Sequence, residues 1–242
     1  MKRKRLIQNT ITVVLLIAAA IVAFRTYTGN YYHANAYETK TANVENTDDF
    51  IAYGDEGSGT GIIFYPGAKV EETAYAPLMD MLADAGIFCV VVKMPEHLAV
   101  LAPNAAKEVM EIYDGVENWY LAGHSLGGAM ASGFAAKHES ELSGLILLAA
   151  YPMEELQELP VLSIYGSEDE VLNKKKYEKS IPLAKVCTEY VIEGGNHSGF
   201  GNYGEQRGDG EAAVSKEEQW QETIDYILNY IRDNAEKMEE GA

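Results

Sequence analysis

Cysteine is scarce in this 242-residue chain, which contains only Cys89 and Cys187. Cys89 lies inside a predicted central strand, whereas Cys187 precedes a strand near the opposite edge of the predicted sheet. This separation argues against a disulfide bond between them. We expect both residues to be buried thiols that pack as small apolar side chains.

Basic residues are also few, because 19 Lys and Arg stand against 37 Asp and Glu, for a formal net charge of -18. Five of the 19 precede the first acidic residue, Glu38, and lie near the N-terminus: Lys2, Arg3, Lys4, Arg5 and Arg25. The rest of the chain is therefore strongly acidic. Such a surface repels nucleic acid and anionic lipid headgroups, which excludes nucleic acid as a partner.

The sequence contains no internal repeat, and no group of His and carboxylate residues has the spacing of metal ligands. We therefore expect neither a metal nor a cofactor. Hydrophobic residues make up 47% and charged residues 23% of the chain, the balance of an ordinary globular domain. The length allows one such domain with a sizeable core, plus a tail.

One long apolar run is present, at residues 11–24, where Thr12 is the only polar side chain. Basic residues precede it, which predicts a single-pass signal anchor with the N-terminus in the cytoplasm and the rest of the chain outside the cell membrane. A cleaved secretory signal is the alternative, because Ala34-Asn35-Ala36 imitates a cleavage site. That site lies twelve residues beyond Phe24, so the anchor is favoured.

Three parts follow from these patterns. Residues 1–36 are the basic segment and anchor, residues 37–49 are a polar linker, and residues 50–242 are a folded domain. In that domain, short apolar runs at residues 50–53, 61–65, 87–92, 119–122, 145–149, 161–165 and 188–192 alternate with helical patterns. The alternation predicts an α/β fold with a doubly wound, mainly parallel sheet, in which ligands bind beyond the carboxyl ends of the strands.

The sequence Gly123-His124-Ser125-Leu126-Gly127 follows one of these runs and precedes a helical segment rich in Gly and Ala. Strand, sharp turn and helix form a nucleophile elbow, in which a strained turn presents the serine hydroxyl at the edge of the sheet. Gly123 and Gly127 allow neighbouring backbone to pass closely. Ser125 is therefore the predicted nucleophile, and a merely structural Gly-rich turn is the competing interpretation.

A serine nucleophile needs a base, usually an imidazole that a third group holds in place. The chain has five histidines, namely His33, His97, His124, His138 and His197. His197 lies in a Gly-rich loop after the last predicted strand, from which its imidazole can reach over the end of the sheet. It also completes the chain order of serine, acid and histidine. His197 is the predicted base.

The acid is expected between the serine and the histidine. A predicted strand ends in Gly166-Ser167-Glu168-Asp169-Glu170, and Asp169 stands three residues after the glycine. Asp169 would hold the imidazole tautomer and stabilise its cation. Glu168 and Glu170 are interpreted as solvated turn residues.

The tetrahedral intermediate of acyl transfer needs hydrogen-bond donors for its oxyanion. We predict the backbone amides of Leu126 and Ala68, the latter in the loop that follows an earlier strand, unless that Pro-Gly sequence is a plain turn. The long loop at residues 198–214 is expected to shape the acyl or leaving-group pocket. Its Phe200 and Arg207, together with Lys69, are candidate substrate contacts, and the alternative is that both basic residues are solvated.

Together these motifs resemble the α/β-hydrolase family, in particular its small members similar to dienelactone hydrolases. The resemblance covers residues 50–231 and rests on Pro66-Gly67-Ala68, residues 123–128, residues 166–169 and residues 195–197. It implies the triad and the oxyanion pair named above. Two departures matter. Dienelactone hydrolases carry a cysteine at the elbow, and only residues 150–160 stand where many relatives insert a helical lid.

The resemblance and the residues lead to the same expectation of function. The chain is expected to be a membrane-anchored, exported serine hydrolase that cleaves a small-molecule carboxylic ester or related acyl bond through an acyl-enzyme. One alternative is a non-catalytic binding or scaffold domain on the same fold. Another is a peptidase or thioesterase with the same triad.

Overall fold

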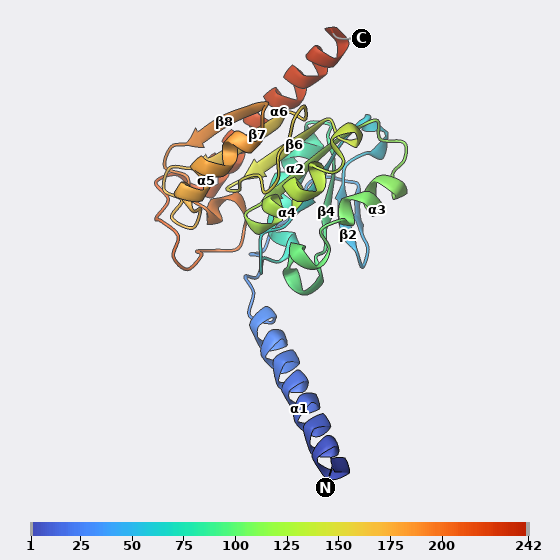
Figure 1. The fold of residues 1–242 in the computed structure, drawn as a ribbon. Helices are drawn as coiled ribbons and strands as arrows, with labels where there is room; N and C mark the ends of the chain where they lie inside the picture. The colour runs from blue at the N-terminus through green and yellow to red at the C-terminus, as the bar shows by residue number, and fades with distance from the viewer. Residues whose placement is uncertain (1, 241–242) are drawn as a thin grey trace. The chain divides into compact units, whose positions relative to one another are not determined.

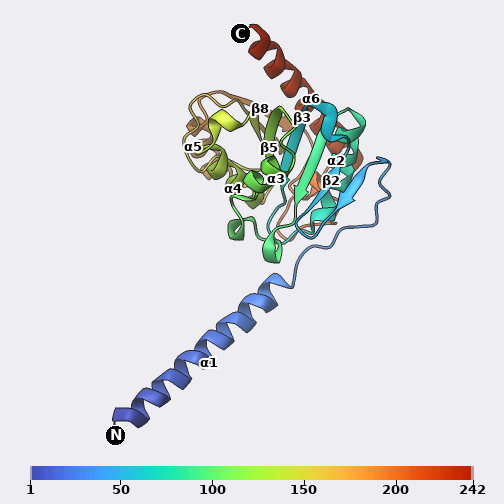
Figure 2. The same cartoon turned by 90° about the vertical axis from the view of Figure 1, so that its right-hand side faces the viewer.

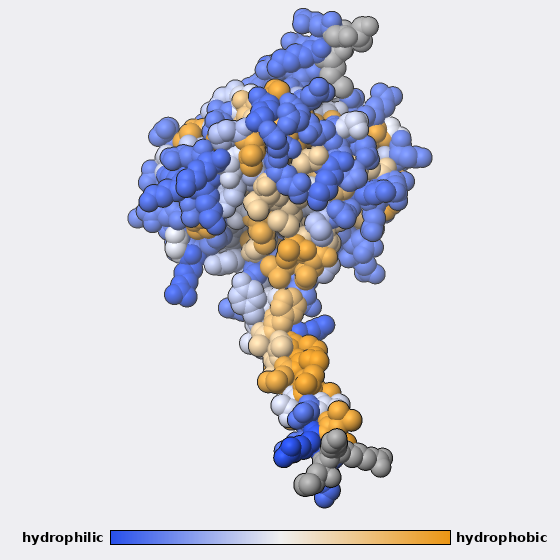
Figure 3. All heavy atoms as spheres, in the orientation of Figure 1, coloured by the Kyte–Doolittle hydropathy of each residue, from blue (hydrophilic) through white to orange (hydrophobic). Residues whose placement is uncertain are grey.

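The computed structural model describes residues 2–240 and divides into two compact units, with the boundary between Tyr31 and Tyr32 (Figure 1). The first unit contains helix α1, Lys2–Thr28. Apolar side chains are exposed along this helix (Figure 3), and residues 4–28 are long and apolar enough to cross a membrane. At 1.5 Å per residue, 25 residues span about 38 Å, which exceeds the ~30 Å of a bilayer core. The helix is thus a candidate membrane span.

Within the described residues, the second unit is built on an eight-stranded sheet in the order β1-β2-β4-β3-β5-β6-β7-β8. Strands β1 and β2 pair antiparallel with their neighbours, and the six others run parallel. In chain order the strands are β1 (Val44–Asn46), β2 (Phe50–Tyr53), β3 (Thr60–Tyr65), β4 (Phe88–Val92), β5 (Asn118–His124), β6 (Gly144–Leu148), β7 (Val161–Gly166) and β8 (Cys187–Ile192).

Five α-helices accompany these strands in the described part of the second unit: α2 (Ala76–Asp84), α3 (Ala105–Ile112), α4 (Leu126–Ala135), α5 (Lys174–Ser180) and α6 (Lys216–Glu240). Short 3₁₀ turns lie between them: η1 (Glu56–Ser58), η2 (Glu72–Tyr75), η3 (Pro95–His97), η4 (Ala99–Leu101), η5 (Glu139–Glu141), η6 (Ile181–Leu183) and η7 (Ser198–Phe200). A capping box starts α6, because the Ser215 amide donates to Glu218 Oε2 at 2.8 Å and the Glu218 amide donates to Ser215 Oγ at 3.2 Å.

Alternate residues along each central strand face two separate cores. Ile62 and Phe64 of β3 pack in the core that contains residues of α2 and α6, whereas Ile63 and Tyr65 pack in the core that contains residues of α3 and α4. Figure 2 shows α2 and α4 on opposite sides of the sheet. Burial of both faces explains why the central strands are continuous apolar runs. The doubly wound, mainly parallel α/β sheet predicted from the sequence is confirmed.

The N-terminal side of the second unit differs from the expected pattern. Residues 37–49, predicted as a linker, include β1 and are held to α2 by the buried carboxylate of Asp80. This carboxylate accepts hydrogen bonds from the Tyr37 hydroxyl at 2.7 Å and from the amides of Lys40 and Thr41 at 2.9 and 2.8 Å. Polar contacts hold much of this segment, with Tyr37 also packed against the core, so the segment shows no apolar periodicity.

Candidate active site

Ser125 stands between the end of β5 and the start of α4, with φ 53° and ψ -123°. Its amide donates to the carbonyl of Leu148 on the neighbouring strand β6, at 2.9 Å. The turn is tight enough to require the two flanking glycines. A Cβ on Gly127 would lie 2.2 Å from the carbonyl oxygen of Tyr65, and one on Gly123 would lie 2.6 Å from the amide nitrogen of Gly128. This is the strand, strained turn and helix of a nucleophile elbow.

Backbone strain gathers around this turn. Positive φ angles occur at the non-glycine residues Lys69, Glu96, His97, Ser125 and Ala149. These residues follow the carboxyl ends of β3, β4, β5 and β6. Such conformations cost about 1–3 kcal/mol each and persist where the surrounding structure holds them for a function. The strain therefore marks the carboxyl edge of the sheet, where ligands bind in this class of fold.

Asp169 and His197 meet at the same edge. His197 Nδ1 lies 2.8 Å from Asp169 Oδ2, and both side chains are almost fully buried. The other carboxylate oxygen, Oδ1, accepts the amides of Val171 and Leu172 at 2.9 and 2.7 Å. These three hydrogen bonds use three of the four lone-pair directions of the Asp169 carboxylate and fix its orientation. The carboxylate therefore holds the proton of the His197 imidazole on Nδ1. His197 Nε2 is buried and has no protein partner within residues 2–240.

The backbone around His197 is clamped on two sides. The Gln219 side chain on α6 accepts the amide of Asn196 at 3.1 Å and donates to its carbonyl at 2.9 Å. The Asp209 carboxylate accepts the amides of His197 and Ser198 at 3.2 and 2.8 Å. These contacts were not foreseen from the sequence, because neither residue belongs to a local motif. They fix the imidazole through its own backbone.

The predicted oxyanion loop lies beside the elbow. The amide of Gly67 donates to the Tyr75 hydroxyl at 2.9 Å, and the amide of Lys69 donates to the carbonyl of His97 at 2.8 Å. Between them, the Ala68 amide has no acceptor in the described part of the chain. Leu126 is the first residue of α4, where an amide has no acceptor within its own helix. Both predicted donors are therefore available to a ligand.

Ser125 and His197 line one pocket of about 290 Å³. Its other walls come from the start of α4, from the segment after β6 and from the segment after Asp169: Leu126, Ala129, Met130, Ala149, Ala150, Tyr151, Met153, Val171, Leu172 and Asn173. Most of these side chains are apolar, and none is acidic or basic. The structure thus brings together the serine and histidine predicted from the sequence around one pocket, with Asp169 bonded behind the histidine.

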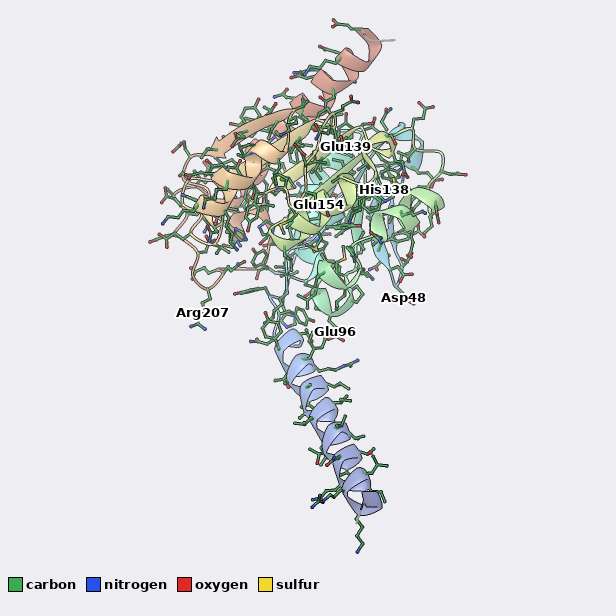
Figure 4. All side chains as sticks on the ribbon, viewed as in Figure 1. Asp48, Glu96, His138, Glu139, Glu154 and Arg207 are labelled. Atoms are coloured by element: carbon green, nitrogen blue, oxygen red, sulfur yellow. The ribbon has the colours of Figure 1, made fainter. Side chains whose placement is uncertain are left out.

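The three predicted substrate contacts lie elsewhere. Phe200 is fully buried, with its ring centroid 5.7 Å from that of His124. Arg207 is exposed and projects away from the second unit (Figure 4). Lys69 is half-buried next to Ala68. None of the three lines the pocket around Ser125. The loop at residues 198–214 instead supplies the Asp209 clamp, since its chain folds back against the backbone of His197.

His124 occupies the variable position of the elbow, where no local pattern indicates a role. It is fully buried, and its ring centroid lies 4.6 Å from that of His197. Its Nδ1 lies 2.8 Å from the Tyr75 hydroxyl. Burial lowers the pKa of His124 well below 6.5, and the charge of a protonated His197 lowers it further, so the His124 ring is neutral.

No group of three or more His, Cys, Asp or Glu side chains within residues 2–240 is arranged to hold a metal ion. The polar groups around the pocket are the side chains of Ser125, Asp169 and His197, the amides of Ala68 and Leu126, and the Tyr75–His124 pair. A serine, a histidine oriented by a carboxylate, and two free amides, one at the start of α4 and one in the loop after β3, are the parts that acyl transfer requires.

Solved structures of other proteins share this fold. MGS-MChE2, an alpha/beta hydrolase enzyme from a sediment metagenome of the Mar Chica lagoon, Morocco, has a TM-score of 0.61 at 16% identity over 80% of this chain and 99% of that one. A structure from a study of Nitrososphaera gargenis carboxylesterases has a TM-score of 0.57 at 12% identity, and the match covers 81% of this chain and 100% of that one. A bacterial membrane phospholipase A has a TM-score of 0.56 at 15% identity, and the match covers 95% of this chain and 100% of that one.

Sequence comparisons point to the same group. A search of curated protein sequences gives no match. The model of the alpha/beta hydrolase family matches residues 61–221, more than half of the chain. This range runs from β3 through the elbow, Asp169 and His197 into α6, and the strand order and the elbow geometry agree with it. The chain therefore belongs to the alpha/beta hydrolase family.

Proposed function

We propose that this protein is a serine hydrolase that cleaves a carboxylic ester through an acyl-enzyme on Ser125. One observation carries the proposal: a serine in a strained elbow and a carboxylate-bound histidine line the same pocket. A structural turn has no need of a buried Asp–His pair beside it, and burying such a pair is costly. The carboxylesterases among the similar folds support an ester as the substrate.

The chemistry follows from the roles that each group can take. Ser125 Oγ gives its proton to His197 Nε2 and attacks the acyl carbonyl, so that a C–O bond forms and the carbonyl becomes an oxyanion. The amides of Ala68 and Leu126 donate to that oxyanion. His197 then protonates the leaving alcohol, and the C–O bond to it breaks. Water repeats the sequence on the acyl-enzyme, which releases the acid and restores Ser125.

The pocket favours an uncharged acyl group of moderate length. Its volume of about 290 Å³ matches roughly ten water-sized groups of ~30 Å³ each, enough for an acyl chain of up to about eight carbons. Apolar side chains form most of its wall, and no Lys or Arg lines it. A substrate carboxylate would lose its hydration there without gaining a partner. We therefore propose simple aliphatic esters, in place of an anionic substrate.

We further propose that α1 is retained as a membrane anchor and that the catalytic unit lies outside the cytoplasm. The basic residues before α1 support this orientation. Retention is supported by the segment after the helix. The amide of Tyr32 donates to the carbonyl of Lys69, and that of Asn35 donates to the carbonyl of Asn202, both at 2.7 Å. Cleavage after Ala36 would remove these contacts from the catalytic unit.

A Ser125→Ala variant tests the proposal. The wild-type chain should react with a fluorophosphonate probe and hydrolyse short p-nitrophenyl esters, and Ser125→Ala should do neither. A panel of aliphatic esters, an acyl thioester and a peptide anilide separates an esterase from a thioesterase or a peptidase, which use the same groups. Ester turnover that persists in Ser125→Ala would overturn the proposal, and an unreactive wild-type serine would favour a binding domain.

A further inference from the structure

Two buried aromatic residues that the reaction does not use connect the oxyanion loop to the elbow. Tyr75 ends η2, His124 ends β5, and both are fully buried. The Gly67 amide donates to the Tyr75 hydroxyl at 2.9 Å, and that hydroxyl lies 2.8 Å from His124 Nδ1. A Cβ on Gly67 would lie only 2.8 Å from His124 Nδ1 and 3.0 Å from the Tyr75 hydroxyl. The loop therefore rests directly on the pair.

The direction of the two hydrogen bonds follows from proton counting. The Gly67 amide can only donate, so the Tyr75 oxygen accepts from it. If the phenol then donates to His124 Nδ1, its own proton is satisfied. In that arrangement His124 carries its proton on Nε2, which is buried and has no hydrogen-bond partner within residues 2–240. If His124 Nδ1 donated instead, the phenol proton and the Nε2 lone pair would both lack a partner. The first arrangement leaves fewer buried polar atoms unpaired and is favoured, so His124 is neutral with its proton on Nε2.

The same histidine also contacts the predicted base. The rings of His124 and His197 have centroids 4.6 Å apart and planes inclined by 47°. His124 is thus linked through Tyr75 to the loop that carries the Ala68 amide. It also contacts the His197 imidazole directly.

We propose that Tyr75 and His124 are positioning residues that hold the oxyanion loop and the His197 imidazole in one fixed arrangement. The inference rests on the proposed hydrolase function. The Tyr75 oxygen accepts the hydrogen bond of the Gly67 amide and so fixes that peptide unit. The next peptide unit then presents the Ala68 amide in a single orientation. His124 supplies the acceptor that orients the phenol, and its ring supports His197. A displacement of about 1 Å in such a site can cost about 100-fold in rate.

Four variants of the full chain test this role: Tyr75→Phe, His124→Phe, His124→Asn and the Tyr75→Phe/His124→Phe double variant. Rates are divided by the concentration of reactive Ser125, measured by titration with a fluorophosphonate, so that unfolded protein does not count. Tyr75→Phe should lower kcat about 10- to 100-fold and leave KM within about twofold, because the lost interaction acts in the transition state. His124→Phe should behave alike.

The remaining variants distinguish positioning from mere packing. His124→Asn keeps an oxygen acceptor near the place of Nδ1, so its kcat should recover to within about fivefold of wild type. The double variant should be little worse than either single variant, because the two residues act as one unit. Tyr230→Phe is the matched control. Its buried hydroxyl donates to the Pro160 carbonyl at the opposite end of the strands, at 2.7 Å, and its loss should leave kcat unchanged.

Two kinetic results would overturn the inference: a normal kcat per reactive serine in Tyr75→Phe, or additive losses in the double variant. A readout that needs no turnover keeps it separate from the proposed function. Nitrogen NMR of the wild-type histidines should show His124 neutral with the proton on Nε2, and the Nδ1 signal should shift in Tyr75→Phe. If wild type hydrolyses no ester, the hydrolase proposal fails, whereas a proton on Nδ1 defeats the positioning inference alone.

Discussion

Replacing Ser125 by glycine should make the protein inactive but more stable. At φ 53° and ψ -123°, any residue with a Cβ is strained at this position, by about 1–3 kcal/mol. Glycine removes that strain, although its freer unfolded chain costs about 0.4–1 kcal/mol. The net gain in unfolding free energy is then about 0.5–2 kcal/mol. For a chain of this size, that raises Tm by about 1–8 °C.

The matched comparison is Ser125→Ala, which is equally inactive but keeps a Cβ and hence the strain. Ser140→Gly is a second control, because Ser140 is exposed in η5 and is not among the residues with positive φ. That variant should lose about 0.5–1 kcal/mol. Thermal and urea unfolding of the full chain in detergent micelles, followed by circular dichroism, measures all three. A Ser125→Gly variant no more stable than Ser125→Ala would refute the argument that the elbow is strained.

Two further predictions use the same site. The pKa of buried His124 lies well below its ordinary 6.5, so the folded state resists protonation and stability present above pH 6.5 is lost as the pH falls. From pH 8 to pH 5 the wild type should lose more unfolding free energy than His124→Asn, by up to about 2 kcal/mol, the limit set by an unfolded-state pKa near 6.5; equal pH slopes in urea titrations would contradict this. Ala129 lines the pocket on α4. Ala129→Phe should therefore lower kcat/KM for an octanoate ester by at least about 10-fold and leave the acetate ester within about threefold, and equal losses on both esters would show that the acyl chain binds elsewhere.

Local patterns were enough to predict most of the fold. The central strands are buried on both faces, so each appears in the sequence as a short apolar run between turn residues. The predicted bounds lie within one or two residues of those of β2 to β8. The start of the last helix is also encoded locally, since both partners of the capping box at Ser215 lie within one turn. Strand β1 was missed because its three residues are exposed and have no apolar alternation.

The sequence by itself also determined the candidate nucleophile, base and acid, because the elbow is a contiguous motif and chain order restricts the other two. Only the tertiary structure decided which residues surround them. The pocket is walled by the segments after β6 and Asp169, the loop at residues 198–214 clamps the backbone of His197, and His124 lies under the site. These contacts join residues that are far apart in the chain, and the path of a long loop depends on packing that no local spacing records.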